Sequence, residues 1–263
     1  MSRVSGAFLN KAFVPFTVLG DPDFDTSLEV VKSMIDAGAD MLELGFPFSD
    51  PVADGPVIQL ADKRALDGGM DVDSCFRLIK SISEYSKVPI SLLVYSNLVF
   101  RRGIDKFYAD AAKAGVDAVL VADIPYEEAS EYVAAALKYG IDPVFLVAQT
   151  TTDGRLSSIL KYARGYIYLV SVLGVTGERR KIEDETVELI KRVKKAASIP
   201  VAVGFGVSLP VHAQKIVASG ADGVIVGSAI VKIIERNLSD KKKMIREIGD
   251  FVREMKKALR GMQ

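Results

Sequence analysis

The stretches Ala37-Gly38-Ala39-Asp40, Ala114-Gly115-Val116-Asp117 and Ser219-Gly220-Ala221-Asp222 decide the fold, because each joins an amphipathic segment to a short apolar one. Glycine just after the last helical residue ends a helix, and the residues that follow it turn into a strand. The joins Val88-Pro89 and Ile199-Pro200 act in the same way, because proline ends a helix and opens a strand. These repeats predict alternating helices and strands.

Short apolar runs recur along the chain, and they are apolar on both faces rather than alternating. This pattern is expected of parallel strands covered by helices on one side and by a barrel interior on the other. The runs are Phe13–Leu19, Met41–Gly45, Pro89–Tyr95, Ala118–Ala122, Pro143–Ala148, Tyr166–Ser171, Val201–Gly204 and Gly223–Gly227. The longer segments predict helices at 26–37, 104–114, 126–139, 155–163, 183–196 and 209–219, with a charged helix near 239–260.

Eight strand–helix units in 263 residues predict an α/β protein, a closed (β/α)8 TIM barrel that forms a single domain over residues 1–263. The competing fold is an open, doubly wound sheet, which requires a Gly-x-Gly-x-x-Gly loop after its first strand. The stretch Thr17-Val18-Leu19-Gly20-Asp21-Pro22 is not such a loop, and no linker-like stretch divides the chain.

Composition excludes several classes of function. The 34 basic and 34 acidic residues give a net charge of zero, so no basic field exists to collect nucleic acid or anionic lipid. Cys75 and His212 are the single cysteine and histidine, and the loops lack a compact acidic cluster, so we expect no metal and no cofactor. No apolar run reaches the ~18 residues of a membrane span and no signal peptide is apparent, so we expect a cytoplasmic protein.

Two carboxylates stand out near the second predicted strand. Barrel enzymes build their sites from loops at the C-terminal ends of strands. Glu43 interrupts an apolar strand, where an acid costs several kcal/mol unless it is paired or used. Asp54 lies in Ala53-Asp54-Gly55-Pro56, which is also an ordinary turn sequence. From these residues alone, a catalytic acid pair and structural carboxylates both stay open.

The last three loops predict a phosphate site, with tight turns as the alternative. Their sequences are Gly174-Val175-Thr176-Gly177, Gly204-Phe205-Gly206-Val207-Ser208 and Gly227-Ser228-Ala229-Ile230, the last of which opens a short helix. Backbone N–H groups beside a helix N-terminus hold phosphate without Lys or Arg. Between the acids and this site we expect inward side chains that together form a slot for a flat aromatic group, although each alone is typical of core packing: Phe16, Ile58, Leu93, Leu120, Tyr168 and Phe205.

The stretch ELGFPFSDPVADGPVIQ at residues 43–59 resembles the signature of the tryptophan synthase α subunit family. The resemblance covers the chain from about Phe13 to Ile230. Its further motifs are Val14-Pro15-Phe16, Gly20-Asp21-Pro22, Tyr95-Ser96-Asn97, Val121-Ala122-Asp123-Ile124-Pro125, Gly174-Val175-Thr176-Gly177 and Gly204-Phe205-Gly206.

This resemblance implies a lyase of L-tryptophan biosynthesis that cleaves indole-3-glycerol phosphate to indole and glyceraldehyde 3-phosphate in a retro-aldol reaction. It also implies an α2β2 heterotetramer with a pyridoxal-phosphate β subunit, which faces residues 47–56, Asn97 and residues 123–125. Glu43 is then the acid–base residue, and Asp54 accepts the indole N–H.

The remaining site residues follow from the same resemblance. Thr176 would hydrogen-bond Asp54, and backbone groups around Gly177, Gly206, Gly227 and Ser228 would hold the phosphate. The indole slot would be lined by Phe16, Leu93, Leu120, Tyr168 and Phe205. Two other functions compete with this one: a different phosphate-ester barrel, either an isomerase or a metal-free aldolase, and a catalytically silent regulatory subunit.

Overall fold

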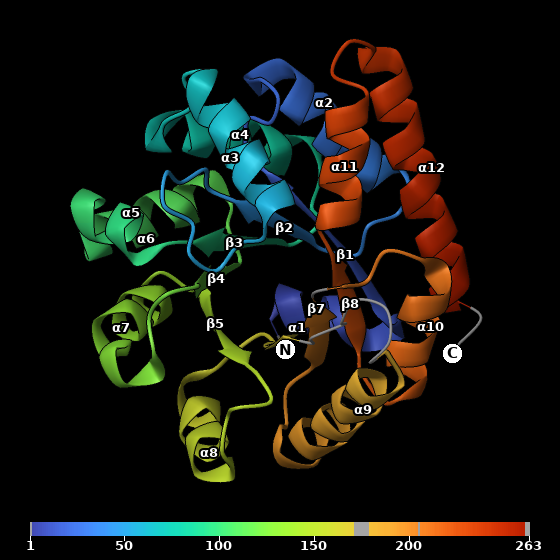
Figure 1. Cartoon of the computed structure of the whole chain (residues 1–263). Coiled ribbons are helices and arrows are strands. Elements are labelled where there is room, and N and C mark those ends of the chain that lie inside the picture. Colours follow the sequence, from blue (N-terminus) through green and yellow to red (C-terminus); the bar gives the residue numbers. More distant parts are fainter. Residues whose placement is uncertain (1, 171–178, 205, 261–263) are drawn as a thin grey trace.

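The strands of the computed structural model close into one ring of parallel neighbours, β1 to β8 and back to β1 (Figure 1). The structure describes residues 2–170, 179–204 and 206–260. The strands are β1 Ala12–Val18, β2 Leu42–Gly45, β3 Ile90–Val94, β4 Ala118–Val121, β5 Asp142–Val147, β6 Ile167–Val170, β7 Val201–Gly204 and β8 Gly223–Val226. The predicted closed barrel is confirmed, and the predicted strand ends agree with these bounds within one residue.

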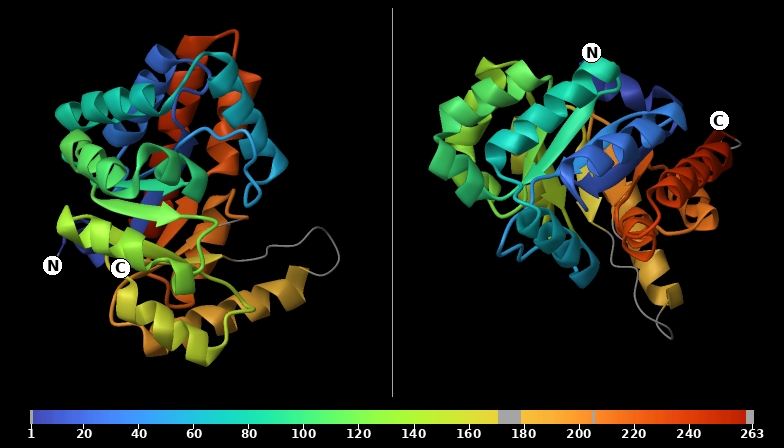
Figure 2. Two further views of the ribbon diagram at one scale, coloured as in Figure 1. Left: turned by 90° about the vertical axis from the view of Figure 1, so that its left-hand side faces the viewer. Right: turned by 90° about the horizontal axis from the view of Figure 1, so that it is seen from above.

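Helices surround this ring (Figures 1 and 2). They are α1 Arg3–Ala7, α2 Phe24–Asp36, α3 Pro56–Asp67, α4 Val72–Tyr85, α5 Ser96–Arg102, α6 Ile104–Ala114, α7 Ser130–Lys138, α8 Asp153–Tyr162, α9 Arg179–Ala196, α10 Pro210–Ala218, α11 Ser228–Arg236 and α12 Lys241–Arg260, with short 3-10 helices η1 Phe8–Asn10 and η2 Tyr126–Glu128. The predicted helix at 104–114 is α6, whereas the one predicted at 126–139 is divided between η2 and α7. The predicted ranges left out α1, α3, α4 and α5. Proline at the first position of α3 favours a helix start there.

The three glycine joins are built alike. Gly38, Gly115 and Gly220 have φ values of +99°, +95° and +107°, a backbone that glycine adopts without steric cost. The aspartate two residues later binds the first residues of the preceding strand. Thus Asp40 accepts the N–H of Phe13 at 2.7 Å, and Asp117 accepts that of Ile90 at 3.0 Å. Asp222 accepts the Val201 N–H at 2.8 Å, so each join fixes two adjacent strands.

Basic side chains from outer elements neutralise these aspartates. Lys256 of α12 pairs with Asp40, and Lys194 of α9 pairs with Asp222. Arg3 of α1 pairs with Asp117 at 2.8 Å. Figure 2 shows the N-terminal helix at the end of the barrel away from the strand arrowheads. The N-terminal end is therefore closed by α1 and by charge pairs, and the C-terminal end is left to the loops.

Two large aromatic rings fill the barrel near the C-terminal ends of its strands, because glycines leave space for them. A Cβ on Gly45 or on Gly227 would lie 2.8 Å from the ring of Phe16, and a Cβ on Gly204 would overlap the phenol of Tyr168. These glycines allow close approach of the backbone to the rings. Phe16 and Tyr168 thus lie at the top of the packed interior. In the part of the chain that the structure describes, no helix is long and apolar enough to cross a membrane.

Candidate active site

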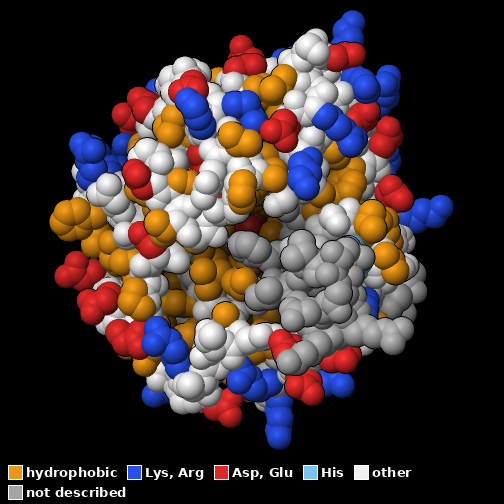
Figure 3. Space-filling model, in the orientation of Figure 1, with side chains coloured by type: hydrophobic (Ala, Val, Ile, Leu, Met, Phe, Trp, Pro, Cys, Tyr) orange, Lys and Arg blue, Asp and Glu red, His pale blue; other side chains and the backbone are white. Residues whose placement is uncertain are grey.

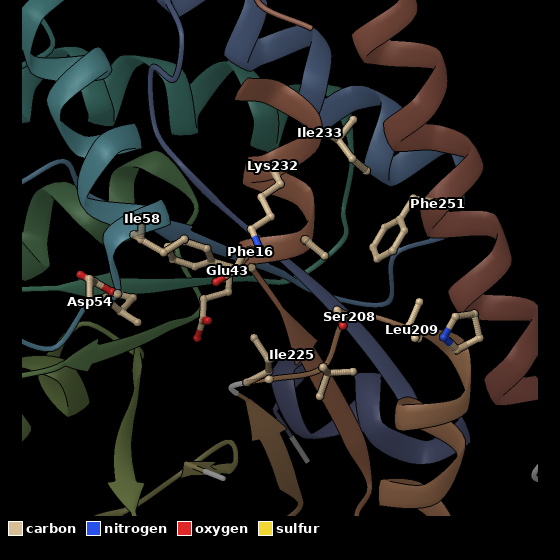
Figure 4. A pocket seen from close by; sticks show the side chains of 18 of the residues that line it. Phe16, Glu43, Asp54, Ile58, Ser208, Leu209, Ile225, Lys232, Ile233 and Phe251 are labelled. Carbon is tan, nitrogen blue, oxygen red and sulfur yellow. The ribbon is translucent and has the colours of Figure 1, made fainter. Parts of the chain in front are cut away.

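A cavity of about 580 Å³ opens at the C-terminal ends of the strands. Figure 3 shows this face hollowed near its centre, with acidic side-chain atoms inside the hollow. Figure 4 shows the side chains that surround the cavity. Among the residues predicted from sequence, those that line it are Phe16, Glu43, Asp54, Ile58, Leu93, Tyr168, Gly206, Gly227 and Ser228. The structure thus brings both predicted acids, four of the six predicted slot residues and two of the three predicted phosphate loops to one space.

The sequence also predicts four further site residues. Leu120 is fully buried next to Leu93 in the register of β3 and β4, and it is not among the described residues that line the cavity. Thr176, Gly177 and Phe205 lie outside the described residues.

Glu43 is a fully buried carboxyl on β2. The Tyr166 hydroxyl donates to its Oε1 at 3.2 Å, and the hydroxyls of Tyr166 and Ser91 are 3.1 Å apart. Its second oxygen, Oε2, has no hydrogen-bond partner among the described residues. Burial raises the pKa of Glu43 to about 8; the Tyr166 hydrogen bond opposes the rise and the negative charge of Asp54 adds to it. A carboxyl of this pKa holds its proton near neutral pH and can release it there.

Asp54 reaches the same cavity from the loop between β2 and α3. The Tyr95 hydroxyl donates to its Oδ2 at 2.6 Å and accepts the N–H of Ala53 at 3.1 Å. Tyr95 is held rigidly because it is 1% exposed and lies between β3 and α5. Burial raises the pKa of Asp54, and the bond from Tyr95 opposes that rise. One acid therefore stands on a strand and the other on a loop that a tyrosine holds.

The start of α11 also lines the cavity. Gly227 and Ser228 form the start of α11, and Gly206 has a φ of +75°. A helix N-terminus presents unpaired N–H groups and a partial positive charge. Lys232, one turn further along α11, points into the cavity in Figure 4. Among the described residues, no group of three or more His, Cys, Asp or Glu side chains could hold a metal ion.

The hydroxyl partners of both acids, Tyr166 and Tyr95, were not predicted from the sequence. Tyr166 lies two residues before Tyr168, and Ser91 and Tyr95 lie two residues on either side of Leu93. Alternate residues of a strand point to the same face. The two-residue period therefore could have placed these three hydroxyls inside the barrel, on the side of the predicted slot.

The fold and this cavity define a (β/α)8-barrel enzyme with a buried carboxyl and a helix N-terminus at the C-terminal mouth of the barrel. Comparison with known proteins identifies the family. The sequence profile described as Tryptophan synthase alpha chain matches residues 7–260. The chain belongs to the tryptophan synthase alpha chain family, which confirms the resemblance found in its sequence.

Individual relatives agree over nearly the whole chain. The tryptophan synthase alpha chain of Methanothermobacter thermautotrophicus is 55% identical over 247 residues, which are 94% of this chain and 92% of the relative. That of Salmonella typhimurium is 48% identical over 250 residues, which are 95% and 93% of the two chains.

Solved structures give the same result. A chain of the tryptophan synthase a2b2 complex from Pyrococcus furiosus is 39% identical, with a TM-score of 0.87 over 94% of this chain and 98% of that one. The alpha subunit from Legionella pneumophila is 31% identical, with a TM-score of 0.91 over 99% of each chain.

The raised pKa of Glu43 predicts a pH-dependent stability. Between the ordinary pKa of 4.5 and about 8, the unfolded chain loses a proton that the folded chain keeps, so the fold is destabilised as pH rises. Glu43→Gln cannot ionise, so its stability relative to the parent should increase from pH 5 to pH 8, by on the order of 1 kcal/mol or more. Urea unfolding at both pH values measures this difference.

The exposed Glu84→Gln variant is the control for this experiment, because Glu84 lies on the surface of α4 with its side chain 65% exposed. Its stability relative to the parent should be the same at both pH values. An equally constant difference for Glu43→Gln would show that Glu43 ionises in the fold as it does in water.

Proposed function

We propose that Glu43 and Asp54 are the catalytic carboxylates of a lyase that cleaves indole-3-glycerol phosphate to indole and glyceraldehyde 3-phosphate. One observation carries the proposal. Glu43, whose Oε2 has no hydrogen-bond partner in the described part of the chain, shares its cavity with Asp54 and with the start of α11. Family membership makes this the α reaction of tryptophan biosynthesis. It disfavours both a small-sugar-phosphate isomerase or aldolase and a silent regulatory subunit.

Glu43 supplies and then recovers one proton. Its neutral carboxyl gives a proton to indole C3, which leaves a carboxylate and a positive charge centred on the ring nitrogen. The carboxylate then takes the proton of the side-chain hydroxyl. The carbon–carbon bond breaks, its electron pair returns to the ring, and an aldehyde forms. Glu43 ends the cycle protonated, and Tyr166 holds it in place throughout at 3.2 Å.

Asp54 stabilises the charge that develops on the ring nitrogen. Tyr95 occupies Oδ2 of Asp54, so Oδ1 is the oxygen that accepts the indole N–H. An anion placed where positive charge appears lowers the energy of the transition state more than that of the substrate. The hydrogen bond from Tyr95 holds the Asp54 carboxylate in this orientation before the substrate binds.

The rest of the cavity binds the two ends of the substrate. The indole packs against Phe16, Ile58, Leu93 and Tyr168, which line the cavity beside the acids. The phosphate is held by N–H groups at Gly206, Gly227 and Ser228. Further roles for Leu120, Thr176, Gly177 and Phe205 rest on the family resemblance.

We also propose an α2β2 heterotetramer with a tryptophan synthase β subunit, since the similar chain from Pyrococcus furiosus belongs to a tryptophan synthase a2b2 complex. Val52 and Phe100, near the surface that the resemblance assigns to the partner, are 83% and 71% exposed. Exposed apolar side chains of this kind are typical of interaction surfaces. We propose a single domain over residues 1–263 and a cytoplasmic location, which the biosynthetic relatives and the single, unpaired Cys75 support.

The acids are tested by replacing each with its amide. Glu43→Gln and Asp54→Asn should each lower the turnover of indole-3-glycerol phosphate by about 100-fold or more, because proton transfer and charge stabilisation are each worth that much. Indole release, measured alone and with a β subunit, gives the result. Unfolding transitions like those of the parent would show that the fold is intact. Turnover near that of the parent in either variant would remove the assigned role of that residue.

The phosphate site is tested by placing a negative charge at the start of α11. Ser228→Asp should raise KM for indole-3-glycerol phosphate by about tenfold or more through repulsion of the phosphate. An acid at a helix N-terminus stabilises the helix, so the loss cannot be attributed to unfolding. Ser130→Asp, at the start of α7, is the matched control. Equal KM values for both variants would place the phosphate elsewhere.

The partner surface is tested at Val52. Val52→Ser removes an exposed apolar group and should weaken binding of a β subunit by about fivefold to tenfold, as measured by calorimetry. Leu137→Ser on α7 removes a side chain that is 49% exposed on another part of the surface, and it should leave the affinity unchanged. A Val52→Ser affinity like that of the parent would exclude this contact.

A further inference from the structure

The hydroxyls of Ser91 and Tyr166 form a hydrogen-bonded chain that ends at Glu43. Ser91 is the neighbour of Glu43 in the register of β2 and β3, whereas Tyr166 directly precedes β6 on another side of the ring. All three side chains are fully buried. Ser91 Oγ and the Tyr166 hydroxyl oxygen are 3.1 Å apart, and the Tyr166 hydroxyl donates to Glu43 Oε1 at 3.2 Å. Neither hydroxyl residue is among the described residues that line the cavity.

The direction of this chain follows from the number of protons that it contains. A hydroxyl donates one proton and accepts with its oxygen. Tyr166 donates its proton to Glu43, so it accepts from Ser91. If Tyr166 donated to Ser91 instead, the Ser91 proton would have no acceptor in the described part of the chain, because Tyr166 is the one hydrogen-bond partner of Ser91 Oγ there. A buried donor without an acceptor is costly, so the chain runs from Ser91 to Tyr166 to Oε1.

Tyr166 is held as a neutral donor at the centre of this chain. Its ring packs against that of Phe8, with 5.3 Å between the centroids. Burial raises the pKa of Tyr166 well above its ordinary value, and the negative charge of Glu43 adds to the rise. The phenol therefore keeps its proton while Glu43 loses and regains one.

The chain stabilises the ionised form of Glu43 more than the neutral form. Its two O–O distances, 3.1 and 3.2 Å, exceed the about 2.7–2.8 Å that is usual between hydroxyl oxygens, whereas hydrogen bonds to an anion are shorter and stronger. The chain can therefore contract when Glu43 becomes a carboxylate. Oε2, which has no hydrogen-bond partner among the described residues, is then the oxygen that exchanges a proton with the substrate.

We propose that Ser91 is a positioning residue for Glu43, because by donating to Tyr166 it holds that hydroxyl at Oε1 and strengthens the bond that stabilises the carboxylate. This inference rests on the proposed catalytic role of Glu43. Each hydrogen bond of a chain polarises the next one, so the Tyr166 hydroxyl is a stronger donor when it also accepts from Ser91. Without Ser91, the carboxylate that remains after proton transfer to the substrate is less stable.

The first experiment measures the kinetics of Ser91→Ala with indole-3-glycerol phosphate. At pH 7, kcat should decrease by about threefold, the effect of weakening one hydrogen bond, while KM stays within about twofold of the parent value. The decrease of kcat at alkaline pH reports ionisation of Glu43, and its midpoint should move up by about 0.5 pH unit. The substitution leaves in place the other titratable and charged side chains that face Glu43 or share its cavity, which are Asp54, Tyr166, Tyr168, Lys232, Arg236 and Glu254.

Thr17→Val is the matched control. Thr17 is also fully buried on a barrel strand, and its hydroxyl has no hydrogen-bond partner among the described residues. Loss of this hydroxyl should leave both kcat and the alkaline midpoint at the parent values. Tyr166→Phe removes the middle of the chain, so adding Ser91→Ala to Tyr166→Phe should cause no further change in either quantity.

A second experiment reads the pKa of Glu43 without catalysis. The stability of Glu43→Gln relative to the Glu43 chain increases with pH and becomes constant above the pKa that Glu43 has in the fold. Urea unfolding of this pair, with and without Ser91→Ala, locates that pH. It should lie about 0.5 pH unit higher when Ser91 is alanine.

Parental kcat in Ser91→Ala would overturn the inference, as would an unmoved pKa of Glu43, an equal loss in Thr17→Val, or a further loss on adding Ser91→Ala to Tyr166→Phe. If the parent chain releases no indole, the proposed function fails instead. In that case the unfolding experiment still decides whether Ser91 acts on Glu43.

Discussion

The fully buried carboxyl of Glu43 is the constraint on which the site depends. A charged carboxylate inside a barrel is costly unless a cation or several hydrogen bonds compensate it. In the described part of the chain no ion pair to Glu43 occurs, and its hydrogen bond comes from the neutral Tyr166 hydroxyl. A lysine or arginine in this place would fix Glu43 as an anion. Neutral hydroxyls instead leave the pKa of Glu43 close enough to neutral pH that the carboxyl can both donate and accept a proton.

Glu43 and Asp54 have different chemical roles because different elements of the fold hold them. Glu43 stands on β2, and its position follows from the register that pairs it with Phe16 and Ser91. Asp54 stands on a loop and depends on Tyr95 for its direction. A buried acid on a strand suits proton transfer, and a half-buried acid on a loop suits a charge that forms beside it. The loop must therefore be fixed from outside the strands, which is why the hydrogen bond from Tyr95 matters to it.

Much of the fold follows from local sequence, and less of the site does. The strands were predictable because apolar runs and glycine joins are local signals, and Glu43 because it interrupts such a run. The strand periodicity places the hydroxyls of Tyr166 and Ser91 inside the barrel, but it does not show that they pair with Glu43. Tyr166 lies 123 residues from Glu43 in sequence, and Ser91 lies 75 residues from Tyr166. Only barrel closure brings these strands together. The prediction for Leu120 used its strand face, and the structure buries this side chain beside Leu93 in the register of β3 and β4.

Acidic residues have a structural role at the N-terminal end of this barrel and a proposed catalytic role at the C-terminal end. The difference depends on the groups that surround them. At the N-terminal end, Asp40, Asp117 and Asp222 each bind a strand N–H and a basic side chain, so their charges hold strands and outer helices together. At the C-terminal end, Glu43 is fully buried. An ion pair to Glu43 would stabilise its anion and remove the chemistry. The ion pairs of Asp40, Asp117 and Asp222 lie at the end where no reaction occurs. At the other end Asp21 pairs with Arg64 at 2.7 Å, and Glu43 has no cation partner among the described residues.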